Sequence, residues 1–215
     1  MESYVLNQLE NSLKIKFSKP QILNLKTYVR HLKKWSQRVR LISKGDRSFI
    51  WERHIMDSLS VLPFILDTGC LLDFGSGGGL PGIPIAIMKP DLRIDLLEAT
   101  RMKCLFLKEM VKVLELNSVA VIHSRSENLV IQPKYKQRYG RITARAVAPL
   151  PSLWASTCEL LSTDGKLIAF KGPEYESEKS VPVESGIELK VQEVKLPIIE
   201  GKRVFVMVNH VSRET

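Results

Sequence analysis

The chain has few cysteines and no long hydrophobic run, which argues against a disulfide-rich protein, a cysteine-based metal site and a membrane-spanning protein. Its 215 residues include three cysteines, which are widely separated and fit neither a disulfide framework nor a metal-ligand spacing. No apolar stretch reaches the roughly 20 residues that a bilayer-spanning helix needs, and the first residues lack the pattern of a secretory signal. We therefore expect a soluble, cytoplasmic protein that has no metal site and does not enter a membrane.

Acidic side chains are scarce relative to basic ones, and the imbalance is uneven along the chain. There are 32 Lys and Arg against 23 Asp and Glu, a formal charge of +9. Residues 1–68 carry +6, residues 69–145 carry +5 and residues 146–215 carry −2. Because Lys and Arg neutralise phosphates in nucleic-acid complexes, this distribution favours a polyanionic partner. Ordinary solvated surface charge is the alternative.

The most informative motif is a glycine-rich turn that follows a short apolar run. Residues 70–74 end in Asp73-Phe74, and glycines follow from Gly75 onwards. Glycine has no Cβ, which lets backbone N–H groups approach a ligand, and Pro81 suits the first turn of a helix. The glycines also match the G-x-G-x-x-G register of dinucleotide enzymes, so the turn alone is compatible with NAD or with S-adenosylmethionine (SAM).

A second acid strengthens the case for a nucleotide-like ligand. Residues 92–98 read as the next strand and end in Glu98, about 20 residues beyond the turn, where ribose hydroxyls are held in such folds. The Asp-x-Gly-x-Gly-x-Gly order that begins at Asp73 resembles the first motif of Rossmann-like SAM methyltransferases. An ordinary turn with a surface Glu is the alternative, and the joint presence of turn and acid disfavours it.

Periodicity predicts helices before residue 69 and alternating strands and helices after it. The predicted helices are 4–16, 20–40, 47–66, 81–88, 101–115 and 150–162, and the predicted strands are 69–74, 92–98, 119–122, 141–145, 166–170, 187–195 and 203–210. This order is typical of an α/β fold with an open, mostly parallel, seven-stranded sheet covered by helices. The last two strands lack a helix between them and are expected to pair antiparallel at the edge. We predict a helical segment over 1–68 and a SAM-binding methyltransferase domain over 69–215, joined as one compact unit.

The helix predicted over 20–40 has two chemically different sides. At about 100° per residue, Leu25, Tyr28 and Leu32 fall on one side and predict packing against the rest of the protein. The opposite side is basic, and its residues, together with the nearby Arg40, are our candidates for binding RNA: Lys26, Arg30, Lys33, Lys34, Arg38 and Arg40. The near absence of acids between residues 20 and 45 favours this hypothesis over a plain solvated face.

Residues just after the predicted strands are further site candidates, because ligands bind beyond the carboxyl ends of strands in open α/β sheets. Ser126 and Glu127 are placed to meet an adenine edge. Arg145 lies among small apolar residues and therefore needs an anionic partner: a ligand carboxylate, an RNA phosphate or an acid such as Asp73. His54 reads as an ordinary packing histidine, because no second His or Cys nearby completes a metal site. The polar stretch 172–180 is expected to form a mobile loop near the site.

Taken together, these residues resemble the bacterial 16S rRNA guanine-N7 methyltransferase family, also called glucose-inhibited division protein B. The matching segments cover most of the chain: 54–59, 73–84, 96–98 with Lys103, 106–107, 124–127, 145–148 and 171–172. The most specific of them are the Gly-Leu-Pro-Gly-Ile-Pro continuation of the turn and the Arg-Ala-Val-Ala run that begins at Arg145.

The resemblance implies a cofactor, a partner and a set of contacts. It implies SAM as cofactor and 16S rRNA of the small ribosomal subunit as partner, and we expect a monomer. The implied cofactor contacts are Gly75, Leu80, Ser126, Glu127 and Arg145, and Glu98 is expected near the ribose. We add Ser76 and Gly77, which lie in the same turn, to the candidate cofactor-binding residues. The chain departs from the family pattern at Ser36, Arg40, Met102 and Arg141, which bears on the fit to the RNA.

No catalytic residue is assigned, because the implied chemistry does not require one. Guanine N7 carries a lone pair in the ring plane and needs no deprotonation before it attacks a methyl group, so catalysis can rest on positioning. Three other functions remain open at this point. They are methylation of another RNA or a small molecule, a non-catalytic RNA- or nucleotide-binding module, and an NAD-dependent dehydrogenase, which is weakened by the lack of an evident catalytic pair for hydride transfer.

Overall fold

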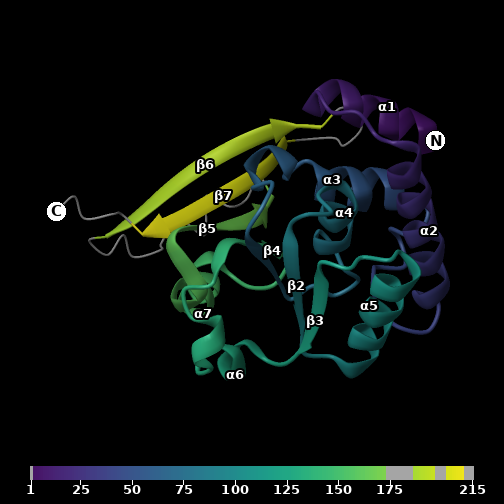
Figure 1. Ribbon diagram of the computed structural model, residues 1–215. Helices are drawn as coiled ribbons and strands as arrows, with labels where there is room; N and C mark the ends of the chain where they lie inside the picture. The colour runs from purple at the N-terminus through teal and green to yellow at the C-terminus, as the bar shows by residue number, and fades with distance from the viewer. Residues whose placement is uncertain (1, 173–185, 197–201, 211–215) are drawn as a thin grey trace.

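A mixed β-sheet forms the centre of the molecule, and helices cover both of its faces (Figure 1). The computed structural model describes residues 2–172, 186–196 and 202–210. Within these residues the sheet has seven strands in the order β3-β2-β1-β4-β5-β7-β6. The strands are β1 Cys70–Phe74, β2 Arg93–Glu98, β3 Val119–His123, β4 Tyr139–Arg145, β5 Leu161–Lys171, β6 Ile187–Lys195 and β7 Lys202–His210.

The strand directions confirm the predicted fold class. Strands β1 to β5 pair parallel, whereas β7 pairs antiparallel with both β5 and β6. The parallel strands thus share one carboxyl end, where ligands bind in such sheets. The connection 196–202 lies mainly outside the described residues, as does the predicted polar loop 172–180 from residue 173 on.

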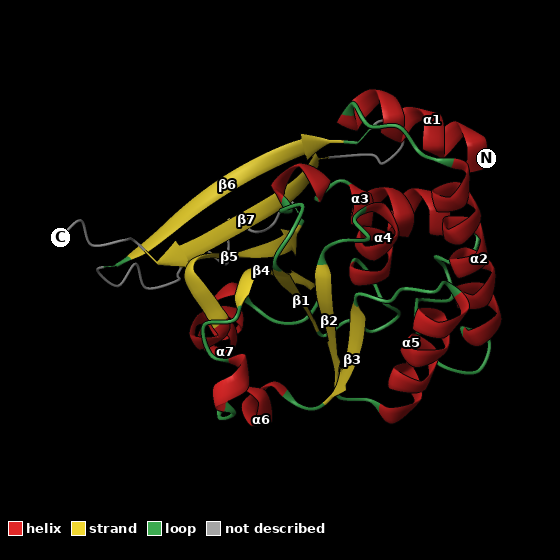
Figure 2. Ribbon diagram, in the orientation of Figure 1, coloured by secondary structure: helices red, strands yellow, loops and turns green. Residues whose placement is uncertain are grey.

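Figure 2 shows the helices in red, and their positions largely follow the apolar periodicity of the sequence. They are α1 Glu2–Leu13, α2 Lys19–Trp35, a π-helical turn Trp51–Met56 that continues into α3 Asp57–Leu59, α4 Gly82–Met88, α5 Arg101–Val113, α6 Ser126–Val130 and α7 Leu150–Thr157. The short helix α6 was not among the predicted elements, because five residues carry too little periodicity to reveal it. Two predicted helices, 47–66 and 150–162, are interrupted: the first begins at Ile50 and the second gives way to β5 at Leu161.

Helix α2 ends at Trp35, five residues earlier than the sequence predicted. The Arg47 guanidinium donates to the carbonyl oxygen of Ser36, which a continuing helix would have offered to the amide of Arg40. Arg38 and Arg40 therefore lie in the turn after the helix and not on its basic side. The prediction of one helix over 20–40 was wrong at this end because a tertiary contact overrides local propensity.

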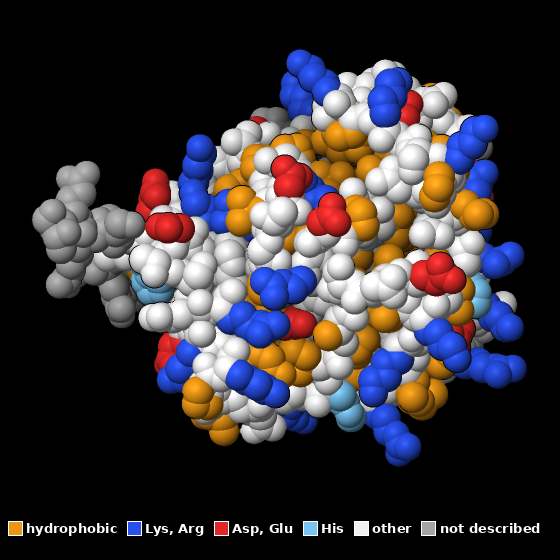
Figure 3. All heavy atoms as spheres, viewed as in Figure 1, with side chains coloured by type: hydrophobic (Ala, Val, Ile, Leu, Met, Phe, Trp, Pro, Cys, Tyr) orange, Lys and Arg blue, Asp and Glu red, His pale blue; other side chains and the backbone are white. Residues whose placement is uncertain are grey.

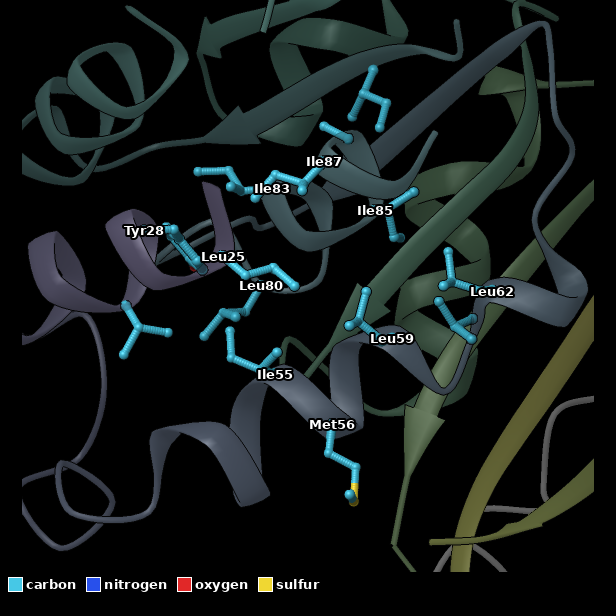
Figure 4. Packing of buried hydrophobic residues seen from close by; sticks show 14 of the residues in the cluster. Leu25, Tyr28, Ile55, Met56, Leu59, Leu62, Leu80, Ile83, Ile85 and Ile87 are labelled. Carbon is cyan, nitrogen blue, oxygen red and sulfur yellow. The ribbon is translucent and has the colours of Figure 1, made fainter. Parts of the chain in front are cut away.

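Helices α1 and α2 pack against the same hydrophobic cluster as the sheet and its covering helices. Val5 and Leu25 belong to one buried cluster with Ile83, Phe106 and Phe205. Figure 4 shows Leu25 and Tyr28 of α2 beside Ile83 and Leu80, which follow the glycine-rich turn. The helical segment thus lies directly on the part of the chain that forms the turn.

Candidate functional site

The glycine-rich turn connects β1 to α4 through a backbone that favours glycine. Gly75, Gly77 and Gly79 have φ angles of +71°, +56° and +82°, in the left-handed region that side chains with a Cβ rarely adopt. Backbone hydrogen bonds hold the turn in place: the Ser76 N–H donates to the Leu97 carbonyl of β2 at 2.9 Å, and the Gly79 N–H donates to the Ser76 carbonyl at 2.7 Å. The glycines are therefore required by the shape of the turn.

Asp73 braces the turn from inside the protein. Its carboxylate is buried and accepts hydrogen bonds from the Gly82 N–H at the start of α4 and from the Thr143 hydroxyl of β4, each at 3.1 Å. A Cβ at Gly82 would lie 2.7 Å from the same carboxylate. Burial raises the pKa of Asp73 to about 6, although its hydrogen bonds lower it in part. Asp73 thus joins two strands to a helix start, and its side chain is buried.

A pocket of about 230 Å³ opens beside the turn at the carboxyl ends of β1, β2 and β3. Four of the predicted cofactor residues line it, Gly75, Glu98, Ser126 and Glu127, whereas the other four do not. The remaining lining residues are Phe74, Leu97, Ala99, Ser124, Arg125 and Val147. The pocket lies where an open α/β sheet binds its ligand, and its walls come from the ends of four strands, β1 to β4.

Glu98, at the end of β2, is one of the residues that line this pocket. The side chain is buried, and its two oxygens accept from the Gly77 N–H at 2.9 Å and from the Thr100 N–H at 2.7 Å. The Lys103 ammonium lies 4.0 Å away. Each carboxylate oxygen can accept a second hydrogen bond, so Glu98 can hold the turn and still receive a ligand hydroxyl.

The other predicted turn residues serve the fold. Ser76 is buried, and its hydroxyl donates to the Asp73 carbonyl at 2.9 Å. Leu80 packs in the hydrophobic core, as Figure 4 shows, and does not line the pocket. Ser126 and Glu127 begin α6; Glu127 is exposed, and Ser126 is partly buried.

Arg145 has an acidic partner, but it is not Asp73. Its Nε lies 3.2 Å from Oδ2 of Asp57, and its guanidinium also contacts the Ser58 hydroxyl at 3.4 Å and Nδ1 of His54. The other carboxylate oxygen of Asp57 pairs with Arg203 of β7. The suggestion of Asp73 as partner was wrong, because Asp57 comes from a segment whose position only tertiary packing determines.

His54 is neutral at physiological pH. Burial and the nearby Arg145 guanidinium lower its pKa to about 4, although Asp46 opposes this shift. Its Nδ1 therefore accepts from Arg145, while Nε2 lies 3.6 Å from Asp46. His54 thus helps to hold Arg145 in place.

Asp73 and His54 predict opposite pH effects on stability between about pH 4 and 6. The folded state holds a proton on Asp73 that the unfolded state has lost, so this group makes stability fall as pH rises, by up to about 1.4 kcal/mol per unit. The unfolded state holds a proton on His54 that the folded state lacks, so this group makes stability rise with pH. Asp73→Asn should steepen the rise of stability with pH relative to the parent, and His54→Gln should flatten it.

Urea unfolding at half-unit pH steps measures both slopes. Asparagine can accept from Gly82 with its oxygen and donate to Thr143 with its amide, so Asp73→Asn keeps the brace while it removes the titration. Parallel curves for the variants and the parent over this range would show that neither pKa is shifted.

The loop after β4 closes one side of the pocket. Ala146 has a φ of +53°, unusual for a residue with a Cβ, and Val147 packs over the turn so that a Cβ at Gly75 would meet its Cγ2 at 2.9 Å. Lys171 donates to the Ala148 carbonyl at 3.1 Å. Sequence reasoning did not assign Val147 or Ala99 to the site, and the strand-end rule extended by one or two residues would have included both.

The predicted RNA-binding residues are all exposed. Lys26, Arg30, Lys33 and Lys34 lie on the outer side of α2, and Lys26 pairs with Glu2 at 3.3 Å. Lys and Arg side chains gather along the edge of the molecule where α2 lies (Figure 3).

The opposite side of α2 reaches the glycine-rich turn. The Tyr28 hydroxyl donates to the Gly78 carbonyl at 2.6 Å, and a Cβ at Gly78 would lie 3.2 Å from Leu32. One helix thus touches the turn with its buried side and offers cations on its outer side.

Neither a membrane-spanning helix nor a cluster of metal ligands is found in the part of the chain that the structure describes. None of its helices is long and apolar enough to cross a membrane. Among residues 2–172, 186–196 and 202–210, no three His, Cys, Asp or Glu side chains come together as metal ligands.

Residues 21–206 match the family model described as rRNA small subunit methyltransferase G. Curated proteins named ribosomal RNA small subunit methyltransferase G are similar over most of their length. The one from Chromobacterium violaceum is 35% identical over 192 residues, which cover 89% of this chain and 90% of the relative. The one from Dehalococcoides mccartyi strain CBDB1 is 34% identical over 208 residues, covering 94% and 88%.

Solved structures share the fold at low sequence identity. A predicted O-methyltransferase from Agrobacterium tumefaciens has a TM-score of 0.59 at 15% identity, covering 74% of this chain and 82% of that one. TYW2 from M. jannaschii, solved in complex with AdoMet, has a TM-score of 0.51 at 17% identity, covering 93% and 80%.

Proposed function

We propose, from the premise that the chain belongs to the rRNA small subunit methyltransferase G family, that it transfers a methyl group from SAM to N7 of a guanine in 16S rRNA. The observation that carries the proposal is the pocket at the carboxyl ends of β1 to β3. It brings Gly75, Glu98, Ser126 and Glu127 to one place beside a turn whose glycines allow close approach.

The residues of the pocket fit SAM in shape and in hydrogen bonding. Gly75 leaves space that a Cβ would fill, next to Val147. Glu98 keeps one free lone pair on each oxygen for ribose hydroxyls, and Ser126 and Glu127 offer a polar edge for the base. We assign the binding of SAM to these four residues, with Arg145 held at the neighbouring strand end by Asp57.

Catalysis by this chain would consist of positioning. SAM, when bound, supplies a methyl group on a positively charged sulfur. Guanine N7 has no proton to lose, so the protein needs no general base and only has to hold the guanine in line with that methyl group. In well-oriented models this effect reaches about 7–11 kcal/mol.

The basic side of α2 is our proposed contact with the RNA backbone. Its cations are exposed, and its buried side bonds to the turn through Tyr28. RNA held by α2 would thus lie on the same rigid unit as the cofactor pocket. We further propose that the enzyme works as a monomer in the cytoplasm, where its ribosomal substrate is found.

Mapping of modified nucleotides tests the proposed reaction. Mass spectrometry of 16S rRNA from cells with and without the protein should show one guanine that loses a methyl group, and the purified protein with SAM should restore it. An unchanged modification profile would refute the proposal. Incubation with labelled SAM and separated pools of RNA and small molecules distinguishes it from methylation of another substrate.

Charge reversal on α2 should weaken RNA binding and leave SAM binding intact. Lys33 and Lys34 are exposed and form no ion pair within the described residues. The double variant Lys33→Glu with Lys34→Glu should lose about tenfold in RNA affinity at moderate salt, and the salt dependence should become shallower by up to about 2 in log–log slope, because phosphate contacts are lost. Filter binding across a salt series measures both quantities.

A matched control reverses two cations elsewhere. Lys134 lies in the turn after α6, and Lys195 lies at the end of β6. Equal losses of RNA affinity in the control pair and in the α2 pair would refute the assignment of α2.

A further inference from the structure

A second pocket, of about 280 Å³, lies at the other end of the parallel strands. It is lined by a short covering segment and by residues of four adjacent strands: Pro63, Phe64, Ile65, Leu66, Arg141, Lys166, Lys190, Gln192 and Met207. Arg141 precedes Arg145 by four residues in β4, which places this pocket about 13 Å along the strand from the carboxyl end. None of its residues lines the cofactor pocket.

Three cations line this pocket, two on the adjacent strands β4 and β5 and one on β6, which β7 separates from β5. Arg141 and Lys166 are direct partners in the β4–β5 register, so their side chains leave the sheet side by side on one face. Lys190 pairs with Met207 across β6 and β7, and Met207 in turn pairs with Ile168 of β5. Like charges directly opposite each other destabilise a sheet unless something neutralises them.

No carboxylate neutralises these cations within the described residues. Ion pairs shorter than 4 Å are found at other sites, and none includes Arg141, Lys166 or Lys190. Arg141 donates instead to the carbonyls of Phe64 at 3.0 Å and of Gly140 at 2.6 Å, and burial lowers its pKa.

Two acids stand near the pocket without lining it. Asp164 precedes Lys166 by two residues in β5, and Glu188 precedes Lys190 by two residues in β6. The Glu188 carboxylate accepts from the Asn209 amide at 3.1 Å. The positive charge of the pocket is therefore available to a ligand.

Apart from Gln192, the remaining lining residues are apolar. The ring of Phe64 packs against Phe205 with centroids 5.5 Å apart, Leu66 is 42% exposed, and Met207 lies between the cationic strands. A ligand that contacts both the three cations and the apolar side chains of this pocket carries a group with one or two negative charges, joined to a flat or apolar part.

We propose that this pocket binds a nucleotide, with its phosphate held by Arg141, Lys166 and Lys190 and its base or sugar against Phe64 and Leu66. The nucleotide is either a free nucleoside monophosphate or one residue of an RNA strand, since both offer the same phosphate chemistry. The site is separate from the cofactor pocket and does not depend on the proposed methyl transfer.

Titration with UMP and with a short single-stranded RNA tests the site and separates the two sources. Saturating S-adenosylhomocysteine is added first, so that the cofactor pocket does not take up the nucleotide. The double variant Lys166→Gln with Lys190→Gln should weaken binding of one of the two probes at least tenfold, and Lys112→Gln, an exposed cation of α5, should not. Neither Lys166 nor Lys190 makes a side-chain hydrogen bond or ion pair that holds the fold in the described residues, so the variant should stay folded.

Each outcome decides the proposal. Loss of UMP binding identifies a free nucleotide as the ligand, and loss of RNA binding alone identifies a nucleotide of an RNA strand. Mass spectrometry after lysine acylation should also show Lys166 and Lys190 protected by the probe that binds. Unchanged affinity for both probes in the double variant would overturn the site, whereas methyl transfer would be unaffected and would still test the proposed function by itself.

Discussion

Replacing Gly75 with Asp should lower the affinity for SAM about a thousandfold, close to 4 kcal/mol. The residue has a φ of +71°, and a Cβ there would lie 2.9 Å from Val147 Cγ2, which itself lines the pocket. The left-handed backbone costs most residues with a Cβ about 1–2 kcal/mol and Asp less, and forced repacking costs about 1–3 kcal/mol. Relief of the clash pushes Val147 or the new carboxylate into the space for the ligand, beside Glu98 and Glu127.

Calorimetry with SAM and with S-adenosylhomocysteine measures the loss, and circular dichroism checks the fold. Gly45→Asp is the matched control, because nothing lies within 4 Å of a Cβ at Gly45 and no left-handed φ is required there. Gly75→Ala separates bulk from charge. A Gly75→Asp variant that binds SAM as tightly as the Gly45→Asp control would remove Gly75 from the site.

The sheet and the turn could be predicted from sequence because both depend on local signals. Alternation of strands and helices after residue 69 leaves few other topologies, and the glycines of the turn encode their own left-handed backbone. The acid at the end of β2 was found by the same logic, since the strand-end rule needs only the order of elements.

Long-range partners could not be predicted in this way. The sequence called for an anion near Arg145, but it could not show that Asp57, 88 residues earlier, would supply it. The early end of α2 depends on Arg47, and the brace formed by Asp73 depends on Thr143. In each case a side chain satisfies a buried polar group across the fold, which no local pattern records.

The turn itself shows how local and long-range terms combine. Its glycines allow the conformation, but Asp73, Glu98 and Tyr28 select it by bonding to Gly82, Gly77 and Gly78. Asp73 directly precedes the turn, whereas Tyr28 in α2 and Glu98 in β2 are distant from it in sequence, and all three hold the same loop. Substitutions far from the pocket can therefore change ligand affinity through the turn.

Asp57→Ala should reduce the free energy of unfolding by about 3–5 kcal/mol, because it removes a buried carboxylate that lies between two arginines. The Asp57 side chain is 1% exposed and pairs with Arg145 and Arg203, which are 17% and 25% exposed. Loss of the carboxylate leaves two poorly hydrated guanidinium groups on β4 and β7, which then repel each other. His54 cannot compensate, because an imidazole carries no negative charge and its Nδ1 already accepts from Arg145.

Urea unfolding at neutral pH measures this loss, and Asp91→Ala is the control, because Asp91 is an exposed acid. Adding Arg203→Met to Asp57→Ala should recover part of the stability, since one of the two uncompensated charges is then gone. The single variant Asp57→Ala should also bind SAM more weakly, because Arg145 loses the carboxylate that orients it beside the loop after β4. A cost for Asp57→Ala no larger than that for Asp91→Ala would mean that the two arginines are adequately solvated without a carboxylate.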